Sequence, residues 1–154
     1  MNISADYPQR CRDAAYRLYL DVQLNCAESV FKAMVESMDV ECPVETLRLA
    51  SGLGGGIGRA GCSCGCILGA TMVMGMVFGR TESTGHPPKV CMAAAHRLHD
   101  EFRASQGSTC CRILHKGLDF GTKEQRLACA DRAAFTAELA AKIIMDELAK
   151  AKAE

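Results

Sequence analysis

The sequence predicts an all-α fold: a single compact helical bundle of about five to six helices, with a Gly-rich loop before a buried helix. Apolar residues recur at helical spacing along most of the chain, and residues typical of helix ends flank these segments. No run alternates between apolar and polar residues over the length that a strand needs. The 154 residues contain no internal repeat and no long linker, so residues 1–154 are expected to form one domain.

The expected helices follow from local signals at their ends. The first starts at Ser4 or Asp6, and Pro43 opens a short third helix. Pro87 or Pro88 begins the fifth, which stops before a glycine. The expected ranges are 6–22, 26–37, 43–50, 64–78, 88–106, 110–114 and 123–149.

Two of these helices carry capping-box signals. Asn25 is expected to cap the second helix, because Glu28 follows three residues later. This assignment puts Cys26 at the first helical position. Thr122 and Gln125 form a similar pair before the last helix.

Residues 52–61 contain six glycines, and residues 56–61 match G-x-G-x-x-G. A dinucleotide site needs a strand before this motif, whereas a helix is expected here, so we reject that interpretation. We expect Gly56, Gly58, Gly61 and the following Gly65 to permit positive φ angles and close approach of the backbone to a cofactor or another helix.

The composition narrows the classes of function. The net charge is zero, there is no tryptophan, and aromatic residues are few, which disfavours nucleic acid and anionic membranes as partners. The most apolar stretch, residues 64–78, is shorter than a membrane span and contains three glycines, so it reads as a buried helix. Residues 1–10 show no signal-peptide pattern, and we expect a cytoplasmic protein. In a reducing compartment, ten cysteines indicate metal binding or redox catalysis.

Seven of the ten cysteines fall into a few places in the sequence. Thiolates are the soft ligands of iron–sulfur clusters and zinc, and they are the nucleophiles of disulfide exchange. Because alternation at every second residue is not a helical spacing, the run 62–66 is expected to lie partly in extended or turn backbone before the helix begins. Adjacent cysteines rarely bridge one another, so at least one of the pair 110–111 is expected to have another partner. The candidate metal ligands are Cys26, Cys62, Cys64, Cys66, Cys110, Cys111 and Cys129, and the cysteines interpreted as structural are Cys11, Cys42 and Cys91.

The histidines give weaker signals. His96 and His99 share a helix face and would make half a metal site, but flanking charged residues favour a solvated face. His86 and His115 are expected in loops. The absence of C-x-x-C argues against a thioredoxin-type site and the usual zinc-ribbon spacing.

The residues resemble the C_GCAxxG_C_C family, small helical proteins named for their cysteine pattern, over about residues 10–145. The segments that carry the resemblance are Asn25-Cys26-Ala27, residues 54–59, Cys64-Gly65-x-x-x-Gly69-Ala70, Cys111 and Cys129. Cys66 departs from the pattern by replacing an alanine, and Cys62 and Cys110 are additional. The resemblance implies a redox role with Cys26, Cys64, Cys111 and Cys129 as the family cysteines. A related domain in split-Soret cytochromes is associated with an iron–sulfur cluster, although the haem motifs are absent here.

Three hypotheses follow for the function. In the first, the four family cysteines bind an iron–sulfur cluster of unknown type for electron transfer or cluster-based reduction, with the remaining candidate ligands as extra or alternative ones. In the second, Cys64 is the attacking thiol of a metal-free thiol–disulfide oxidoreductase, and Cys26 or Cys111 resolves the mixed disulfide. In the third, the cysteines hold a structural zinc. A redox partner protein or a small-molecule electron donor is expected, and glycine-faced helices are compatible with a homodimer.

Overall fold

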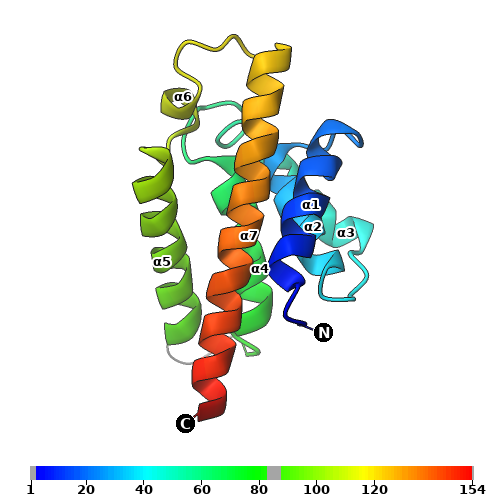
Figure 1. The fold of residues 1–154 in the computed structure, drawn as a ribbon, viewed down its shortest axis with the longest axis vertical. Coiled ribbons are helices and arrows are strands. Elements are labelled where there is room, and N and C mark those ends of the chain that lie inside the picture. Colours follow the sequence, from blue (N-terminus) through cyan, green and yellow to red (C-terminus); the bar gives the residue numbers. More distant parts are fainter. Residues whose placement is uncertain (1–2, 83–87, 154) are drawn as a thin grey trace.

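The computed structural model describes residues 3–82 and 88–153, and these residues confirm the all-α prediction (Figure 1). Five longer helices, two short ones and a 3-10 turn follow in order. They are α1 (Tyr7–Leu20), α2 (Cys26–Glu36), α3 (Val44–Arg48), η1 (Ser51–Leu53), α4 (Gly65–Phe78), α5 (Lys89–Gln106), α6 (Cys111–Leu114) and α7 (Lys123–Ala153). Pro88 caps α5, whereas Pro87 lies outside the described residues.

The long helix α7 is the centre of the bundle and packs against α1, α2, α4 and α5 (Figure 1). Its buried face is rich in alanine, which lets the neighbouring helices approach closely. Phe102 on α5 and Phe135 on α7 lie with their ring centroids 6.3 Å apart in a tilted arrangement. The buried apolar residues of these helices form one core cluster.

The expected capping box of α2 is confirmed. The Asn25 side chain accepts hydrogen bonds from the N–H groups of Ala27 and Glu28, and the Glu28 carboxylate accepts the Asn25 N–H at 2.9 Å. Cys26 is therefore the first residue of α2, with its orientation set by a satisfied helix N-terminus.

Only half of the expected capping box forms at α7. Thr122 Oγ1 accepts the Gln125 N–H at 3.2 Å. The Gln125 side chain does not return to Thr122; it accepts the Gly121 N–H at 2.9 Å and donates to Cys129 Sγ at 3.2 Å. The Gln125 side chain therefore bonds to Cys129 and to the Gly121 N–H, and it makes no capping-box bond to the Thr122 backbone.

Glycines bring α4 against α2, as expected. A Cβ at Gly69 would overlap the Ala27 carbonyl, and a Cβ at Gly65 would overlap the Cys26 sulfur. Gly75 differs, because a Cβ there would meet no atom within 4 Å. None of the helices in the described ranges combines the length and apolar character that crossing a membrane requires.

Candidate functional site

A cleft of about 510 Å³ opens at one end of the bundle. Here the end of α1, the start of α2, the loop 54–61, α6 and the start of α7 come together (Figure 1). The cleft is lined by Tyr19, Gln23, Leu24, Asn25, Cys26, Ser51, Gly54, Gly55, Gly58, Arg59, Cys111, His115, Phe120, Gly121, Gln125, Arg126 and Cys129. Its volume is in the range typical of small-molecule sites.

Three of the four family cysteines, Cys26, Cys111 and Cys129, line this cleft, and the fourth, Cys64, lies close to them. The four come from different places in the fold: the start of α2, the residue before α4, the start of α6 and the first third of α7. All four are buried, and every pair among them lies close enough for the charge of one thiolate to affect the pKa of the other. We call Cys26, Cys64, Cys66, Cys111 and Cys129 the thiol centre.

Cys26 has a strongly lowered thiol pKa. The Cys66 thiol hydrogen-bonds to it, and the backbone N–H groups of Gly55, Ala27 and Cys26 itself also donate to its sulfur. Together these donors outweigh the cost of burial and lower the pKa of Cys26 to about 6. The absence of a side chain at Gly65 makes the space that this sulfur occupies.

Cys66 lies between Cys26 and Cys64 and hydrogen-bonds to both. Its own pKa is raised because the two neighbouring sulfurs hold its proton and burial disfavours its charge. One thiol carries one hydrogen, so Cys66 supports only one of its neighbours at a time. The pKa of Cys64 is also lowered, first by Cys66, but Cys64 does not line the cleft. Of the two thiols with lowered pKa, Cys26 is the one that an incoming molecule reaches.

Cys129 and Cys111 also line the cleft, and the pKa of each is raised. The Cys129 sulfur lies 3.2 Å from His115 Nε2 and 3.2 Å from Gln125 Nε2, and Tyr19 hydrogen-bonds to it as well. Burial raises the pKa of Cys129 and raises the pKa of Cys111 to about 12.

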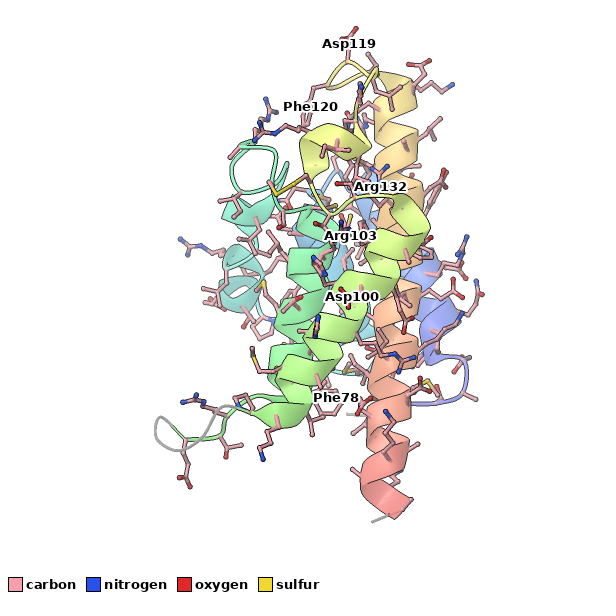
Figure 2. All side chains as sticks on the ribbon, turned by 90° about the vertical axis from the view of Figure 1, so that its left-hand side faces the viewer. Phe78, Asp100, Arg103, Asp119, Phe120 and Arg132 are labelled. Atoms are coloured by element: carbon pink, nitrogen blue, oxygen red, sulfur yellow. A yellow bond between two sulfur atoms is a disulfide. The ribbon has the colours of Figure 1, made fainter. Side chains whose placement is uncertain are left out.

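A half-buried arginine, Arg132, lies near the thiol centre with two of its nitrogens buried. Nε and Nη1 of Arg132 have no hydrogen-bond partner among the described residues, and Nη2 donates to the Leu114 carbonyl at 3.4 Å. Its charge acts to lower the pKa of Cys64, Cys111 and Cys129. Figure 2 shows Arg132 on α7, on the side of the bundle where α5 and α6 lie. Two unpaired donors on a cation near Cys64, Cys111 and Cys129 favour negative charge at this place.

The glycine loop forms one wall of the cleft in an unusual backbone conformation. Residues 55–59 all have positive φ, including Ile57 at 57° and Arg59 at 68°. This turn carries the Arg59 guanidinium over the Phe120 ring, 4.7 Å from the ring centroid. Gly58 lines the cleft with no atom within 4 Å of an added Cβ.

The other glycines expected to bind a cofactor make close contacts inside the protein. A Cβ at Gly56 would lie 2.6 Å from the Cys62 nitrogen and 3.0 Å from the Cys111 Cβ. A Cβ at Gly61 would lie 3.1 Å from the Arg112 side chain. These glycines, like Gly65, bring the cysteine segments together and do not line the cleft.

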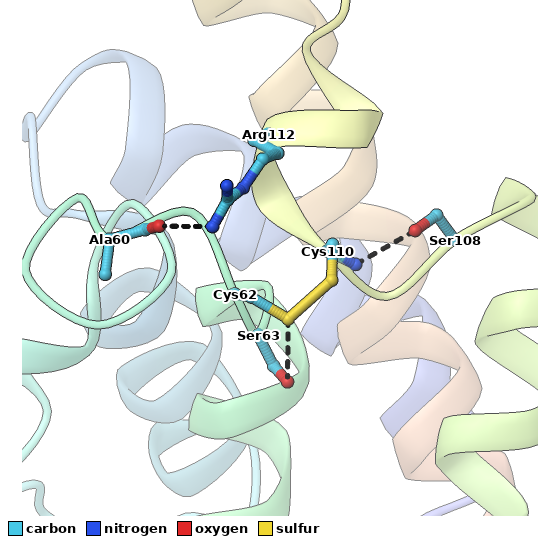
Figure 3. The surroundings of a disulfide bond; sticks show 6 residues. All are labelled: Ala60, Cys62, Ser63, Ser108, Cys110 and Arg112. Carbon is cyan, nitrogen blue, oxygen red and sulfur yellow. Dashed lines mark hydrogen bonds between the residues drawn. A yellow bond between two sulfur atoms is a disulfide. The ribbon is translucent and has the colours of Figure 1, made fainter.

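Cys62 and Cys110 form a disulfide that ties the end of the glycine loop to the start of α6 (Figure 3). Arg112 strengthens the same junction, because its Nη2 donates to the Ala60 carbonyl at 3.1 Å. The prediction that one of the adjacent pair 110–111 has another partner is confirmed. In this state Cys62 and Cys110 bind each other, so their sulfurs are not available as the extra metal ligands that we expected.

The extended backbone expected around residues 62–64 is confirmed, because Cys64 precedes α4 with φ −58° and ψ 129°. Cys11 and Cys42 are buried elsewhere and Cys91 is half-buried on α5, so none of the three belongs to the site. His96 and His99 are exposed beside Asp100, as expected of a solvated face. His86 lies outside the described residues.

In the described ranges, no group of three or more His, Cys, Asp or Glu side chains is arranged to hold a metal ion.

Sequence reasoning missed several neighbours of the thiol centre. His115 lies in the turn after α6, as expected of a loop residue, but its contact with Cys129 was not foreseen. Burial and the charge of Arg132 lower the pKa of His115. Gln125 could have been found, because it precedes Cys129 by one helical turn. Tyr19 and Arg132 carry no signal in the sequence, since only the packing of α1 and α7 brings them to the cysteines.

Comparisons with known proteins agree with this geometry. No curated protein and no solved structure matched the chain. One family model matches residues 24–143, and its description reads "Putative redox-active protein (C_GCAxxG_C_C)". The match covers most of the chain and includes every residue of the thiol centre. The protein therefore belongs to the C_GCAxxG_C_C family.

Proposed function

We propose that this protein is an electron-transfer protein that binds an iron–sulfur cluster through Cys26, Cys64, Cys111 and Cys129. The observation that carries this proposal is the convergence of these four buried thiols, from four parts of the chain, on one end of the bundle. A redox protein or a small molecule would exchange electrons with it at the cleft.

The donor set fits such a cluster. Four thiolates are the usual protein ligands of iron–sulfur clusters, which supply reversible one-electron transfer. The unpaired donors of Arg132 would face the negative charge, and the Gly55 N–H would donate to the Cys26 sulfur.

A second candidate is metal-free thiol–disulfide exchange, and one specific observation favours it. Cys26 opens on the cleft with a pKa of about 6, so its thiolate predominates at neutral pH. The Cys26 thiolate would attack one sulfur of a substrate disulfide and expel the other half as a thiolate. Cys66 would then lose its proton, attack the Cys26 sulfur and release the second half as a thiolate, so that two electrons pass from the protein to the substrate.

Purification without oxygen, followed by iron, acid-labile sulfide and visible absorbance measurements, tests the first candidate. We expect a brown protein that loses iron when any of the four ligands is changed to serine, with Cys42→Ser as the control. A colourless protein that stays free of iron after cluster reconstitution would contradict the cluster.

Cys66→Ser separates the two candidates. If a cluster is the redox centre, this variant keeps its iron, because Cys66 is outside the proposed ligand set. If Cys26 exchanges disulfides, the variant accumulates a mixed disulfide at Cys26 when it meets a small disulfide, which mass spectrometry detects.

A further inference from the structure

We propose that the cleft binds a small anionic molecule, whose negative group is held by Arg59 and Arg126 above the Cys26 sulfur. This inference deepens the proposed function by naming the chemical class of the small-molecule partner. The inference rests on the shape and charge of the cleft. It therefore applies whether the thiol centre binds an iron–sulfur cluster or exchanges disulfides.

The charge of the lining carries the proposal. The cleft is lined by Arg59 and Arg126, while none of the described residues that line it is Asp or Glu. No ion pair within the described part of the chain neutralises either arginine. One carboxylate that touches the lining, that of Glu28, is already bound by the Asn25 N–H and the Ser51 hydroxyl.

The guanidinium groups of Arg59 and Arg126 both have N–H donors that are not engaged in the contacts described here. Arg126 Nη2 donates to the Leu20 carbonyl at 3.2 Å, which anchors one end of its fork and leaves the other donors free to bind. Arg59 stacks on Phe120, a contact that holds the plane of the guanidinium without using its N–H groups. Phe120 is exposed at the end of the molecule beyond α6, as Figure 2 shows.

The backbone of the glycine loop also fits this role. Holding Arg59 at a positive φ is unfavourable for a residue with a side chain. Arg59 and its neighbour Gly58 both line the cleft, and a Cβ at Gly58 would meet no atom within 4 Å. Strained backbone of this kind clusters at active sites, ligand clamps and switch regions.

The cleft leads from these cations to the reactive sulfur. Cys26, Cys111 and Cys129 line the same cleft as the two arginines, and Asn25, Tyr19 and Gln125 add neutral polar groups to its lining. An anion attracted by the arginines therefore enters the cleft that the Cys26 thiol lines. The cleft volume of about 510 Å³ is in the range of sites that bind small molecules.

Charge-selective alkylation of Cys26 tests the proposal. Iodoacetate and iodoacetamide react with a thiolate in the same way, each losing iodide, but only iodoacetate carries a negative charge. The full-length, metal-free protein, with its Cys62–Cys110 disulfide intact, is treated with each reagent, and mass spectrometry follows labelling of Cys26. We expect the rate ratio of iodoacetate to iodoacetamide to exceed that of the unfolded protein by about fivefold or more.

Arginine variants make the test specific. Arg59→Gln and Arg126→Gln should each lower the ratio severalfold, and Arg59→Lys should retain most of it. Arg103→Gln, on the exposed end of α5, should leave it unchanged. A ratio equal to that of the unfolded protein, or one insensitive to Arg59 and Arg126, would overturn the proposal. Because the assay uses metal-free protein, this outcome is independent of whether the protein binds iron.

Discussion

The sulfur of Cys26 occupies the space that a side chain at Gly65 would fill. The start of α2 thereby meets the start of α4, and a thiol with a lowered pKa lies against a residue that has no side chain. Gly65 and Cys26 are far apart in the sequence, and their contact joins the glycine–cysteine block to the rest of the thiol centre.

Gly65→Ala should destabilise the protein by about 1–3 kcal/mol, the usual cost of overpacking a core. The added methyl group would overlap the Cys26 sulfur and approach the Leu53 carbonyl oxygen to 2.9 Å. Gly75→Ala is the matched control on the same helix. It has open space and should stabilise α4 by up to about 1 kcal/mol. Urea unfolding of the two variants measures both effects, and equal shifts would argue against close packing at Gly65.

The alkylation rate of Cys26 should depend on pH with a midpoint near 6, since its pKa is lowered to about 6. The rate rises with pH below the midpoint and is level above it, because only the thiolate reacts. Cys66→Ala removes the largest cause of the shift, so the midpoint should move up. Cys91→Ala, on α5 away from the cleft, should not move it. A midpoint near 9 in the wild-type protein would show that Cys26 is an ordinary thiol.

The same ionisation should appear in the stability of the metal-free protein. A folded-state pKa below the unfolded value of 9.0 adds stability that is complete above about pH 9 and is lost as the pH falls through 6. The difference in unfolding free energy between the wild type and Cys26→Ser should therefore shrink as the pH falls from about 9 to about 6. Urea titrations at a series of pH values measure this difference, and a difference that grows on acidification would have the wrong sign.

Ile57→Gly should raise the stability of the protein by about 1 kcal/mol. Ile57 is half exposed and has a positive φ, which is unfavourable for a β-branched residue and free of cost for glycine. Ile113→Gly is a fitting comparison, because Ile113 is equally exposed but lies in the helix α6, where glycine should destabilise by about 1 kcal/mol. Thermal unfolding distinguishes the two, and a loss of stability at both positions would contradict strain at Ile57.

Removing the disulfide with the double variant Cys62→Ala, Cys110→Ala should cost about 4 kcal/mol of unfolding free energy. The bond closes a loop of 48 residues, and this is the chain-entropy value for a loop of that length. Urea unfolding without reductant gives the value, with Cys42→Ala as a control for the loss of a free cysteine. A cost no larger than that of the control would indicate that the bond does not form in solution.

Local sequence signals were enough to place the helices and to locate one residue of the site, Cys26, at a helix start. Helical periodicity and end signals placed the longer helices within a few residues of their observed ends, because these signals act over one or two turns. The Asn25 capping box put Cys26 at the start of α2, where the structure has it. The spacing of Cys62, Cys64 and Cys66 excluded a helix before residue 64, as observed. The cysteine pattern also indicated the family.

Only the tertiary structure decided which sulfurs are partners and which are accessible. Cys62 lies next to Cys64 in a motif but is bonded to Cys110, and Cys64 is covered while Cys26 opens on the cleft. Arg132 and His115 reach the thiol centre because α6 and α7 pack there. Spacing along a chain sets which face of a helix a residue occupies, whereas ionisation and bonding depend on distances between helices, which packing alone determines.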